Sequence, residues 1–304
     1  MTITVVGSIN VDHVMRVSRF PQPGETLTGS DYQIAAGGKG ANQAVAAARS
    51  GAKTQFIACA GNDAMGVQLR DDFIADGIDV SHLSLLDGEP TGLAMITVSD
   101  DAENMISIYA GANACLSATH VEAASSLIAS SEILLMQLET PIETLVAAAK
   151  IARAAGVKVV LNPAPATALP DALLGLVDMI TPNQTEAELL TGIAVVDEVS
   201  ARLASEQLHR LIPEVVITMG GQGAFYSSSL SSMLIAGFKV AARDTTAAGD
   251  TFNGALVTAL VEGQSITAAL RFAHAAAALS VTKHGAQPSV HDRDAIEAFL
   301  VNQG

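Results

Sequence analysis

Short β-branched runs alternate regularly with longer helix-forming stretches along most of the chain. The run ITVVGSI at 3–9 is almost continuously apolar, as expected of a strand covered on both faces in a parallel sheet. Similar runs lie at 55–59, 133–136, 157–161, 178–181 and 215–219. Helix-like stretches lie at 41–50, 65–76, 119–129, 142–155, 184–191 and 199–210, and after residue 250 at 248–262, 266–283 and 292–302. The pattern predicts one α/β domain over residues 1–304, with a doubly wound, mostly parallel sheet flanked by helices.

Two segments break this alternation. Residues 11–35 contain prolines and glycines between short strand-like pieces. Residues 91–110 are typical of a hairpin, in which LAMITV and NMISIY flank a turn at 99–103. Together they predict a small β-sheet lid over the ligand edge, although an edge extension of the main sheet is an alternative. The apolar positions on both hairpin strands need cover, and a second copy of the chain in a homodimer would supply it.

Charge and cysteine content exclude several classes of protein. The 16 basic and 31 acidic residues give a net charge of −15, which disfavours binding to nucleic acid and to acidic membranes. An anionic ligand would therefore need local positive features, such as the N-terminus of a helix. Cys59 and Cys115 are too few and too far apart for a disulfide framework or a zinc cluster. The N-terminus has no basic segment and no apolar run suits a membrane helix, so we expect a cytoplasmic protein.

The stretch DTTAAGDTFNGA at 244–255 joins a predicted strand to a long apolar helix. The small residues Ala247, Ala248 and Gly249 allow a tight turn, so that successive N–H groups at the helix start can bind an anion such as phosphate. Asp250 would then lie beside the hydroxyl that approaches this phosphate, which is the geometry of phosphoryl transfer. The helix dipole favours the charged form of a carboxylate at this position, so Asp250 is expected to be a weak base. The alternative is that Asp250 is an N-cap and Gly249 a plain turn.

Other polar residues are predicted at the carboxyl ends of strands. The stretch GGKGAN at 37–42 is neither a Walker A loop nor a dinucleotide fingerprint, and it suits a small polyhydroxylated ligand unless it is only a structural turn. Asn10 and Asp12 follow the first strand, and Glu139 follows the strand at 133–136. Asn183 and Glu186 could form a capping-box pair or hold water on Mg²⁺.

Five motifs together resemble one protein family from end to end. They are GSINVD at 7–12, GGKGANQAVAAARSGA at 37–52, NPAP at 162–165, TPNQTEAE at 181–188 and DTTAAGDTFNGA at 244–255. The chain is similar in these motifs to the ribokinase-like family of carbohydrate kinases. This resemblance implies an α/β domain with a β-sheet lid that also forms a dimer contact. It also implies ATP-dependent phosphorylation of D-ribose at the 5-hydroxyl.

The resemblance also assigns roles to individual residues. It makes Asp250 the catalytic base and places Gly249, with Ala248 and Ala247, in the anion hole. The implied sugar contacts are Asn10, Asp12, Gly38, Lys39, Gly40, Asn42, Glu139 and Asp250. The implied ATP contacts are Asn183, Thr218, Gly220, Gly221, Gly223, Gly249 and His274, although His274 alone is more typical of a core or groove histidine. Glu186 would act on Mg²⁺ through water, and a monovalent cation such as K⁺ would be bound by Asp244, Thr246, Ser280, Lys283, Gly285 and Ser289.

One position departs from the family pattern. Arg243 precedes Asp244 where relatives usually carry an uncharged residue, so an ion pair between the two could compete with the cation. Strand alternation is expected to direct Arg243 to the opposite face.

Three alternative functions remain open from the sequence. The first is a kinase for deoxyribose, another small sugar or a nucleoside. The others are a sugar- and nucleotide-binding regulator without turnover and an α/β scaffold without a nucleotide. The combination of Asp250, the anion hole and the cation ligands argues against the last two, because a binder without turnover needs no base.

Overall fold

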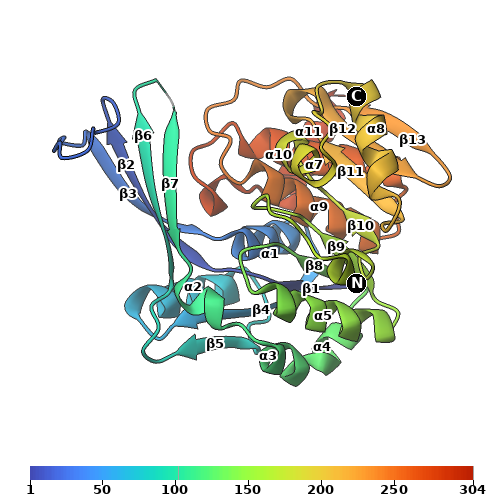
Figure 1. Ribbon diagram of the computed structural model, residues 1–304, viewed down its shortest axis with the longest axis horizontal. Helices are drawn as coiled ribbons and strands as arrows, with labels where there is room; N and C mark the ends of the chain where they lie inside the picture. The colour runs from blue at the N-terminus through green and yellow to red at the C-terminus, as the bar shows by residue number, and fades with distance from the viewer. Residues whose placement is uncertain (102, 304) are drawn as a thin grey trace.

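A central mixed sheet of nine strands has helices on both faces, as the computed structural model of residues 1–101 and 103–303 shows (Figure 1). The strand order is β13-β12-β11-β10-β9-β8-β1-β4-β5. The strands are β1 (Thr2–Val6), β4 (Lys53–Gly61), β5 (Leu83–Leu86), β8 (Ile133–Met136), β9 (Lys158–Leu161), β10 (Met179–Ile180), β11 (Glu214–Thr218), β12 (Gly223–Ser228) and β13 (Ser232–Ala236). All neighbours from β5 to β11 pair in parallel, whereas β12 and β13 add an antiparallel edge. The predicted doubly wound, mostly parallel sheet is confirmed.

Two apolar cores lie on the two faces of this sheet. Alternate side chains of each strand enter different cores, so Val5 and Phe56 pack on one face and Val6 and Ile57 on the other. The first core is covered by α1 (Lys39–Arg49), α2 (Ala64–Ala75), α9 (Ala248–Val261), α10 (Ile266–Ser280) and α11 (Arg293–Gln303). The second is covered by α3 (Ala118–Ala123), α4 (Ser125–Ala129), α5 (Ile142–Ala154), α6 (Asp171–Leu174), α7 (Gln184–Thr191) and α8 (Glu198–Leu208). None of the helices described is both long and apolar enough to span a membrane.

A second sheet of four strands projects from one edge of the molecule as the lid (Figure 1). Its order is β3-β2-β6-β7, with β2 (Asn10–Val17), β3 (Asp31–Gly37), β6 (Gly92–Ser99) and β7 (Asn104–Tyr109). β2 and β6 pair in parallel at the centre, and the outer pairs are antiparallel. Position 102 of the predicted turn at 99–103 lies outside the described residues.

Two expected strands differ from the structure. The run at 3–9 was expected to be one strand, but β1 ends at Val6 and the chain continues into lid strand β2. A Cβ on Gly7 would lie 2.7 Å from Cα of Gly40, so the start of α1 crosses the chain closely at this break. The strand expected before Asp244 is also absent from the described structure, in which residues 237–247 contain no regular strand.

Close packing of small residues holds α1 against α9. A Cβ on Gly254 would lie 2.6 Å from Cβ of Ala46 and 2.6 Å from the carbonyl oxygen of Gln43. Only glycine allows this approach, because a larger residue would separate the two helices. The contact brings the start of α1 next to the start of α9.

Candidate active site

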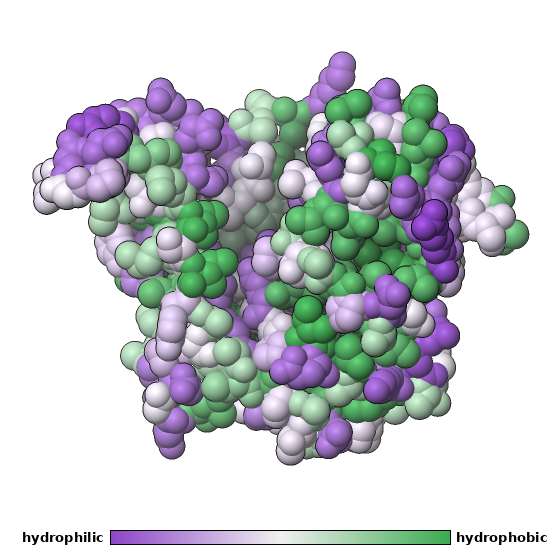
Figure 2. All heavy atoms as spheres, in the orientation of Figure 1, coloured by the Kyte–Doolittle hydropathy of each residue, from purple (hydrophilic) through white to green (hydrophobic). Residues whose placement is uncertain are grey.

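The predicted polar residues gather where β1 and β8 end and the lid begins. Asn10 is the first residue of β2 and Asp12 lies on the same strand, so both project from the lid and not from a loop of the main sheet. Gly37, the last residue of β3, pairs with Asn10. The glycine-rich turn therefore begins beside β2. Figure 2 shows the surface hollowed between the lid and the body of the molecule. A ligand held there would contact both parts.

The glycine-rich turn is fixed by close backbone contacts. Gly38 has a φ of +89°, and a Cβ there would lie 2.7 Å from the backbone nitrogen of Asn10. At the start of α1, the N–H of Lys39 donates to Oε2 of Glu139 at 3.0 Å. The Ser8 hydroxyl donates to the same oxygen at 2.5 Å. The turn therefore has the structural role that was one alternative, and it also places Lys39 among the carboxylates of the candidate site.

Lys39 is surrounded by acidic groups. The carboxylates whose charges act on it are Asp12, Glu139, Glu186 and Asp250. Burial lowers the pKa of Lys39, but these carboxylates outweigh burial and the net shift is upward. Burial raises the pKa of Asp12 to about 6, and the negative charges of Glu139 and Asp250 add to that shift. A pocket with one cation and several carboxylates suits a neutral polyol that donates hydrogen bonds, and it would repel a sugar that already carries phosphate.

Asp250 lies in the first turn of α9 and is only 6% exposed. Its Oδ2 accepts a hydrogen bond from Nδ2 of Asn42 at 3.0 Å, and its Oδ1 accepts one from Nε2 of Gln43 at 2.9 Å. Burial raises the pKa of Asp250 above its usual value, although the charge of Lys39 and the two amide donors oppose the shift. The expectation of a weak base was therefore wrong, because it implied a lowered pKa for Asp250 and the pKa is raised. It considered the helix dipole and omitted the burial of this helix end against α1.

The start of α9 presents free N–H groups. Ala247 precedes the helix with a φ of 57°, which is the left-handed conformation and is unusual for a residue other than glycine. The N–H of Ala248 donates to the carbonyl oxygen of Thr245 at 3.2 Å. The N–H groups of Gly249 and Asp250 make no hydrogen bond to any residue that the structure describes. A Cβ on Gly249 would meet nothing within 4 Å, so space remains for a ligand at this helix start.

Asn42 also leaves a polar atom free. Its Oδ1 is buried and has no hydrogen-bond partner among residues 1–101 and 103–303. Because its Nδ2 donates to Asp250, this oxygen remains as an acceptor for a donor on a ligand.

A capping box joins Asn183 and Glu186 at the start of α7. The Asn183 side chain accepts from the N–H of Glu186 at 2.9 Å, and Glu186 accepts from the N–H of Asn183 at 2.8 Å. Burial raises the pKa of Glu186. The structure thus contains the capping box that was one interpretation of this pair. Asn183 also bridges to Thr218 at the end of β11, which joins two of the expected ATP contacts.

The glycine turn after β11 is open on one side. A Cβ on Gly220 or Gly221 would meet no atom within 4 Å, whereas a Cβ on Gly223 would lie 1.9 Å from the carbonyl oxygen of Ile235. Gly223 is therefore needed for the close approach of β13, and the first two glycines leave a surface free. His274 of α10 packs on the ring of Phe252 with centroids 5.0 Å apart. Burial lowers the pKa of His274 to about 4, so the imidazole is neutral near pH 7.

Asp244 connects the segment before α9 to the segment after α10. Its Oδ1 accepts from the N–H of Thr246 at 2.9 Å, and its Oδ2 accepts from the N–H of Gly285 at 2.9 Å. Burial opposes the shift, but these bonds outweigh it and lower the pKa of Asp244. The two segments that carry the expected cation ligands, 244–246 and 280–289, therefore meet at Asp244 and Gly285.

Several carbonyl groups of this region are free to ligate a cation. Within the described residues, four of the expected ligands have carbonyl oxygens that accept no hydrogen bond: Thr246, Lys283, Gly285 and Ser289. The carbonyl oxygen of Ser280 accepts from the N–H of Lys283 at 3.1 Å. Unpaired carbonyl oxygens next to one carboxylate can ligate a cation.

Arg243 lies in a bend and not in a strand, so strand alternation does not determine its direction. Its N–H donates to the carbonyl oxygen of Val281 at 2.7 Å. Among the described residues, the basic side chain within 4.0 Å of the Asp244 carboxylate is His284. The ion pair that Arg243 could have formed with Asp244 is absent from the described part of the chain.

Comparison with known proteins places this chain in a family. The model of the pfkB family of carbohydrate kinases matches residues 2–293. The chain belongs to this family. The family assignment made from the sequence motifs is confirmed, and so is its classification as a phosphotransferase.

Relatives of this carbohydrate kinase match it over almost its full length. It is 55% identical over 300 residues to a ribokinase of Haemophilus influenzae, covering 98% of each chain. It superimposes on a structure of Arabidopsis thaliana ribokinase complexed with ribose and ATP with a TM-score of 0.93, at 33% identity and over 98% of both chains. It is also 33% identical over 302 residues to a deoxyribokinase of Salmonella typhi, covering 99% of each chain. The identity to the first relative exceeds that to the deoxyribokinase.

Several buried amide residues of the candidate site were not predicted from the sequence. Gln43 contacts Asp250, and Asn162 in turn contacts Gln43. Asn113 donates from Nδ2 to Oδ1 of Asn10 at 2.8 Å and also pairs with the backbone of residue 9. The only available signal was that these residues lie within or near the quoted motifs, as Gln43 does in GGKGANQ and Asn162 in NPAP. Asn113 carried no such signal.

Proposed function

We propose that this kinase transfers the γ-phosphoryl group of ATP to the 5-hydroxyl of D-ribose, giving D-ribose 5-phosphate and ADP. The observation that carries the proposal is the position of Asp250. It is a buried carboxylate in the helix turn that also presents the free N–H groups, and it adjoins a pocket of hydrogen-bonding groups. The ribokinase relatives and the solved ribokinase complexed with ribose and ATP support this substrate pair.

The sugar side of the pocket combines donors and acceptors. Asn10, Asp12, Lys39, Asn42 and Glu139 would contact the sugar, as would the turn of Gly38 and Gly40, whose lack of a Cβ lets it pack against the backbone of residues 7–10. Asn113 donates to Oδ1 of Asn10, so Asn10 presents its NH₂ group to a ligand. Asp12 and the free Oδ1 of Asn42 instead accept from hydroxyl groups. A neutral pentose offers both kinds of partner.

The chemical step needs one base and one anion hole. As the 5-oxygen forms its bond to the γ-phosphorus, the bond from that phosphorus to the bridging oxygen breaks and ADP leaves with the electron pair. The hydroxyl proton passes to the carboxylate of Asp250. The N–H groups of Gly249 and Asp250 stabilise the charge on the phosphoryl oxygens, and Ala247 and Ala248 set the turn that orients them.

The nucleotide would lie between α7, the glycine turn after β11 and α10. Asn183, Thr218 and the open Gly220–Gly221 backbone would contact it, with Gly223 shaping the turn and neutral His274 beside Phe252. Glu186 fits a role toward Mg²⁺ through water, because its carboxylate is buried near Lys39 and each oxygen retains a free lone pair. When bound, Mg²⁺ would neutralise phosphate charge.

We further propose a monovalent-cation site, a dimer and a cellular location. Asp244 with the free carbonyl groups of the 283–289 segment fits K⁺ better than Mg²⁺, which demands a tight octahedron and keeps its waters. The lid face opposite Asp12, its outer face, carries exposed apolar side chains such as Met95 and Tyr109, and it fits a homodimer contact. Both cysteines are free, and burial raises the pKa of Cys59 to about 12, which fits an inert thiol in the reducing cytoplasm.

An assay of ADP release across pentoses, hexoses and nucleosides tests the substrate. D-ribose should give the highest kcat/KM. With 2-deoxyribose, part of the hydrogen bonding in the closed pocket is lost, and kcat/KM should fall roughly 5-fold to 150-fold. Equal use of the two sugars would favour a deoxyribokinase.

The Asp250→Asn variant tests the mechanism in the same assay. It preserves the shape of the side chain and should retain ATP binding, but kcat should fall by about 10²-fold to 10⁴-fold, the usual range for a positioned base. A variant that keeps more than a tenth of the wild-type kcat would remove Asp250 from the mechanism.

A further inference from the structure

Gln43 lies behind the base and is fully buried in α1. Both hydrogens of its amide are used, because Nε2 donates to Oδ1 of Asp250 at 2.9 Å and to Oδ1 of Asn162 at 3.0 Å. Its Oε1 accepts from Nε2 of Gln137 at 2.5 Å. The amide thus connects α1, the end of β8 and the end of β9 to the start of α9.

A backbone carbonyl group determines which group donates in each hydrogen bond of this series of amides. Nδ2 of Asn162 donates to the carbonyl oxygen of Thr181 at 2.9 Å, and a carbonyl oxygen can only accept. Oδ1 of Asn162 must therefore face Gln43, which has to donate to it. Gln43 consequently presents its NH₂ group, and not its oxygen, to Asp250. An alternative orientation of any one amide would oppose two like groups in a buried site.

We propose that Gln43 is a positioning residue for phosphoryl transfer, which holds Oδ1 of Asp250 so that the Oδ2 side, next to Asn42, receives the proton of the sugar hydroxyl. The inference rests on the proposed role of Asp250 as the base. A donor on Oδ1 stabilises the ionised carboxylate that the reaction needs, and it fixes the carboxylate plane. Gln43 acts through Asp250 and contacts neither the phosphate nor the sugar in this assignment.

The other charges that act on Asp250 come from several elements. They are Lys39 of α1, Glu139 after β8, Asp12 of β2 and Glu186 of α7. None of these is changed by a substitution at Gln43. A change in the pH dependence of the chemical step in such a variant would therefore report the loss of the amide donor.

The test is the Gln43→Met substitution, which keeps the length of the side chain and removes its hydrogen bonds. The rate of phosphoryl transfer is measured by rapid quench under single-turnover conditions from pH 5 to 9. We expect the rate at pH 7.5 to fall roughly 10-fold to 100-fold, and the acid limb of the profile to move to higher pH by about 0.5 to 1 unit, as expected for the loss of one hydrogen bond to a carboxylate. KM for ribose and ATP should change less than about 3-fold, because the assigned contacts remain.

A matched control is Gln55→Met. Gln55 is a buried glutamine of β4 whose Oε1 accepts from the Thr4 hydroxyl at 2.9 Å, away from the site. It should lower stability and leave the pH profile unchanged. If Gln43→Met does not fold, Asn162→Ala removes the partner that fixes the amide, and it should move the acid limb in the same direction by a smaller amount.

A folded Gln43→Met variant with the wild-type rate and profile would overturn the proposal. A slower rate without movement of the acid limb would also overturn it, because packing alone would then explain the loss. Failure of the base itself is seen separately, as an Asp250→Asn variant that retains its rate.

Discussion

Asp12 shows how a residue that we propose for sugar binding can lower the stability of the protein that carries it. Its carboxylate is partly buried on β2, near the negative charges of Glu139 and Asp250. Burial and these charges raise its pKa from 3.8 to about 6, and Lys39 offsets only part of the shift. No hydrogen-bond donor among residues 1–101 and 103–303 acts on this carboxylate, and the hydroxyl groups of the proposed sugar would supply such donors.

The pH dependence of this effect has a definite sign. The folded protein holds the Asp12 proton more tightly than the unfolded chain does, so the free energy of unfolding falls as the pH rises from about 4 to about 6. Asp12→Asn should therefore increase the free energy of unfolding by about 1 to 2 kcal/mol at pH 7.5, allowing for partial exposure. The gain should disappear below pH 4. Thermal or urea unfolding at the two pH values measures it.

Asp101→Asn is a suitable control, because Asp101 is an exposed carboxylate of the same lid. It should leave the stability unchanged at both pH values. An Asp12→Asn variant that is less stable than the wild type at pH 7.5 would show that the carboxylate makes favourable contacts in the free protein. The same variant should bind ribose more weakly, since it loses an acceptor.

Residues in local motifs were easier to predict than their buried partners. Asp250 and Lys39 lie in stretches whose small residues and spacing indicate an anion hole and a sugar turn. Gln43 and Asn162 meet only because α1 and β9 come together in the fold, across 119 positions of sequence. Burial was also not visible in the local pattern, which explains the wrong direction expected for the pKa of Asp250.

At the scale of elements, continuous apolar runs in the sequence predicted the strands that are covered on both faces. β8 was predicted with its observed bounds, and β9 and β11 within one residue at either end. The hairpin of β12 and β13 was not predicted, because serines interrupt its two short apolar runs and its strands lie at the sheet edge. The helix expected at 119–129 is divided into α3 and α4, and α6 was too short to show a period.

The cation prediction depends on the segment before α9 and the segment after α10. An ion between Asp244 and the free carbonyl groups of 283–289 would fix the turn that presents the N–H groups of Gly249 and Asp250. It would not touch the sugar. We therefore expect K⁺ or Cs⁺ to raise kcat above its value in Na⁺ or Li⁺ at constant ionic strength, and Asp244→Ala to lose this activation.

Asp197→Ala provides a matched control for this variant. Asp197 accepts from the N–H and the hydroxyl of Ser200 at 2.8 and 2.7 Å, as Asp244 does from Thr246, but it caps α8. It should keep the full activation by K⁺. Equal rates in K⁺ and in tetramethylammonium would refute the cation site, and the side chain of His284, 4.0 Å from the Asp244 carboxylate, would then be the group to test next.

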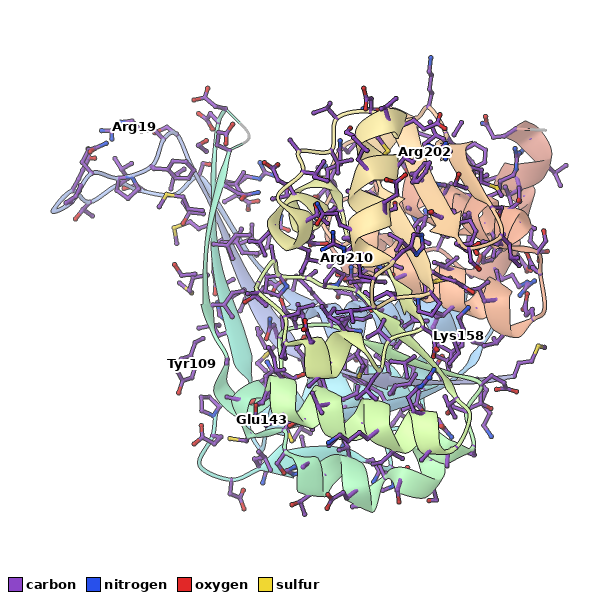
Figure 3. The ribbon with its side chains drawn as sticks, turned by 45° about the vertical axis from the view of Figure 1, so that its right-hand side comes forward. Arg19, Tyr109, Glu143, Lys158, Arg202 and Arg210 are labelled. Carbon is purple, nitrogen blue, oxygen red and sulfur yellow. The ribbon has the colours of Figure 1, made fainter. Side chains whose placement is uncertain are left out.

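At the scale of the whole molecule, the two faces of the lid have different surroundings. Asp12 pairs with Ala94, and Ala94 pairs with Ile108, so these three side chains share the inner face of the lid, on which the charges of Lys39 and Asp250 act on Asp12. Side chains one residue away point to the opposite, outer face. That face carries large apolar residues that are exposed in the single chain: Met15, Tyr32, Ile34, Met95, Met105 and Tyr109. Figure 3 shows Tyr109 projecting away from the main sheet.

This arrangement predicts a dimer whose lids pack outer face to outer face. Burying several large apolar side chains that are about half exposed, such as Met95 at 51% and Tyr109 at 56%, would be favourable by roughly 1 kcal/mol or more for each. Light scattering at micromolar concentration should therefore give twice the mass of the chain. Met95→Glu places a charge near the centre of the face and should give a monomer, whereas Leu230→Glu, at a site 94% exposed on the far edge of the main sheet, should leave the dimer intact. Because the lid carries Asn10 and Asp12 on its inner face, the monomeric variant should also have a higher KM for ribose and an unchanged KM for ATP. A wild-type protein that is monomeric at this concentration would show that the outer face of the lid has another purpose.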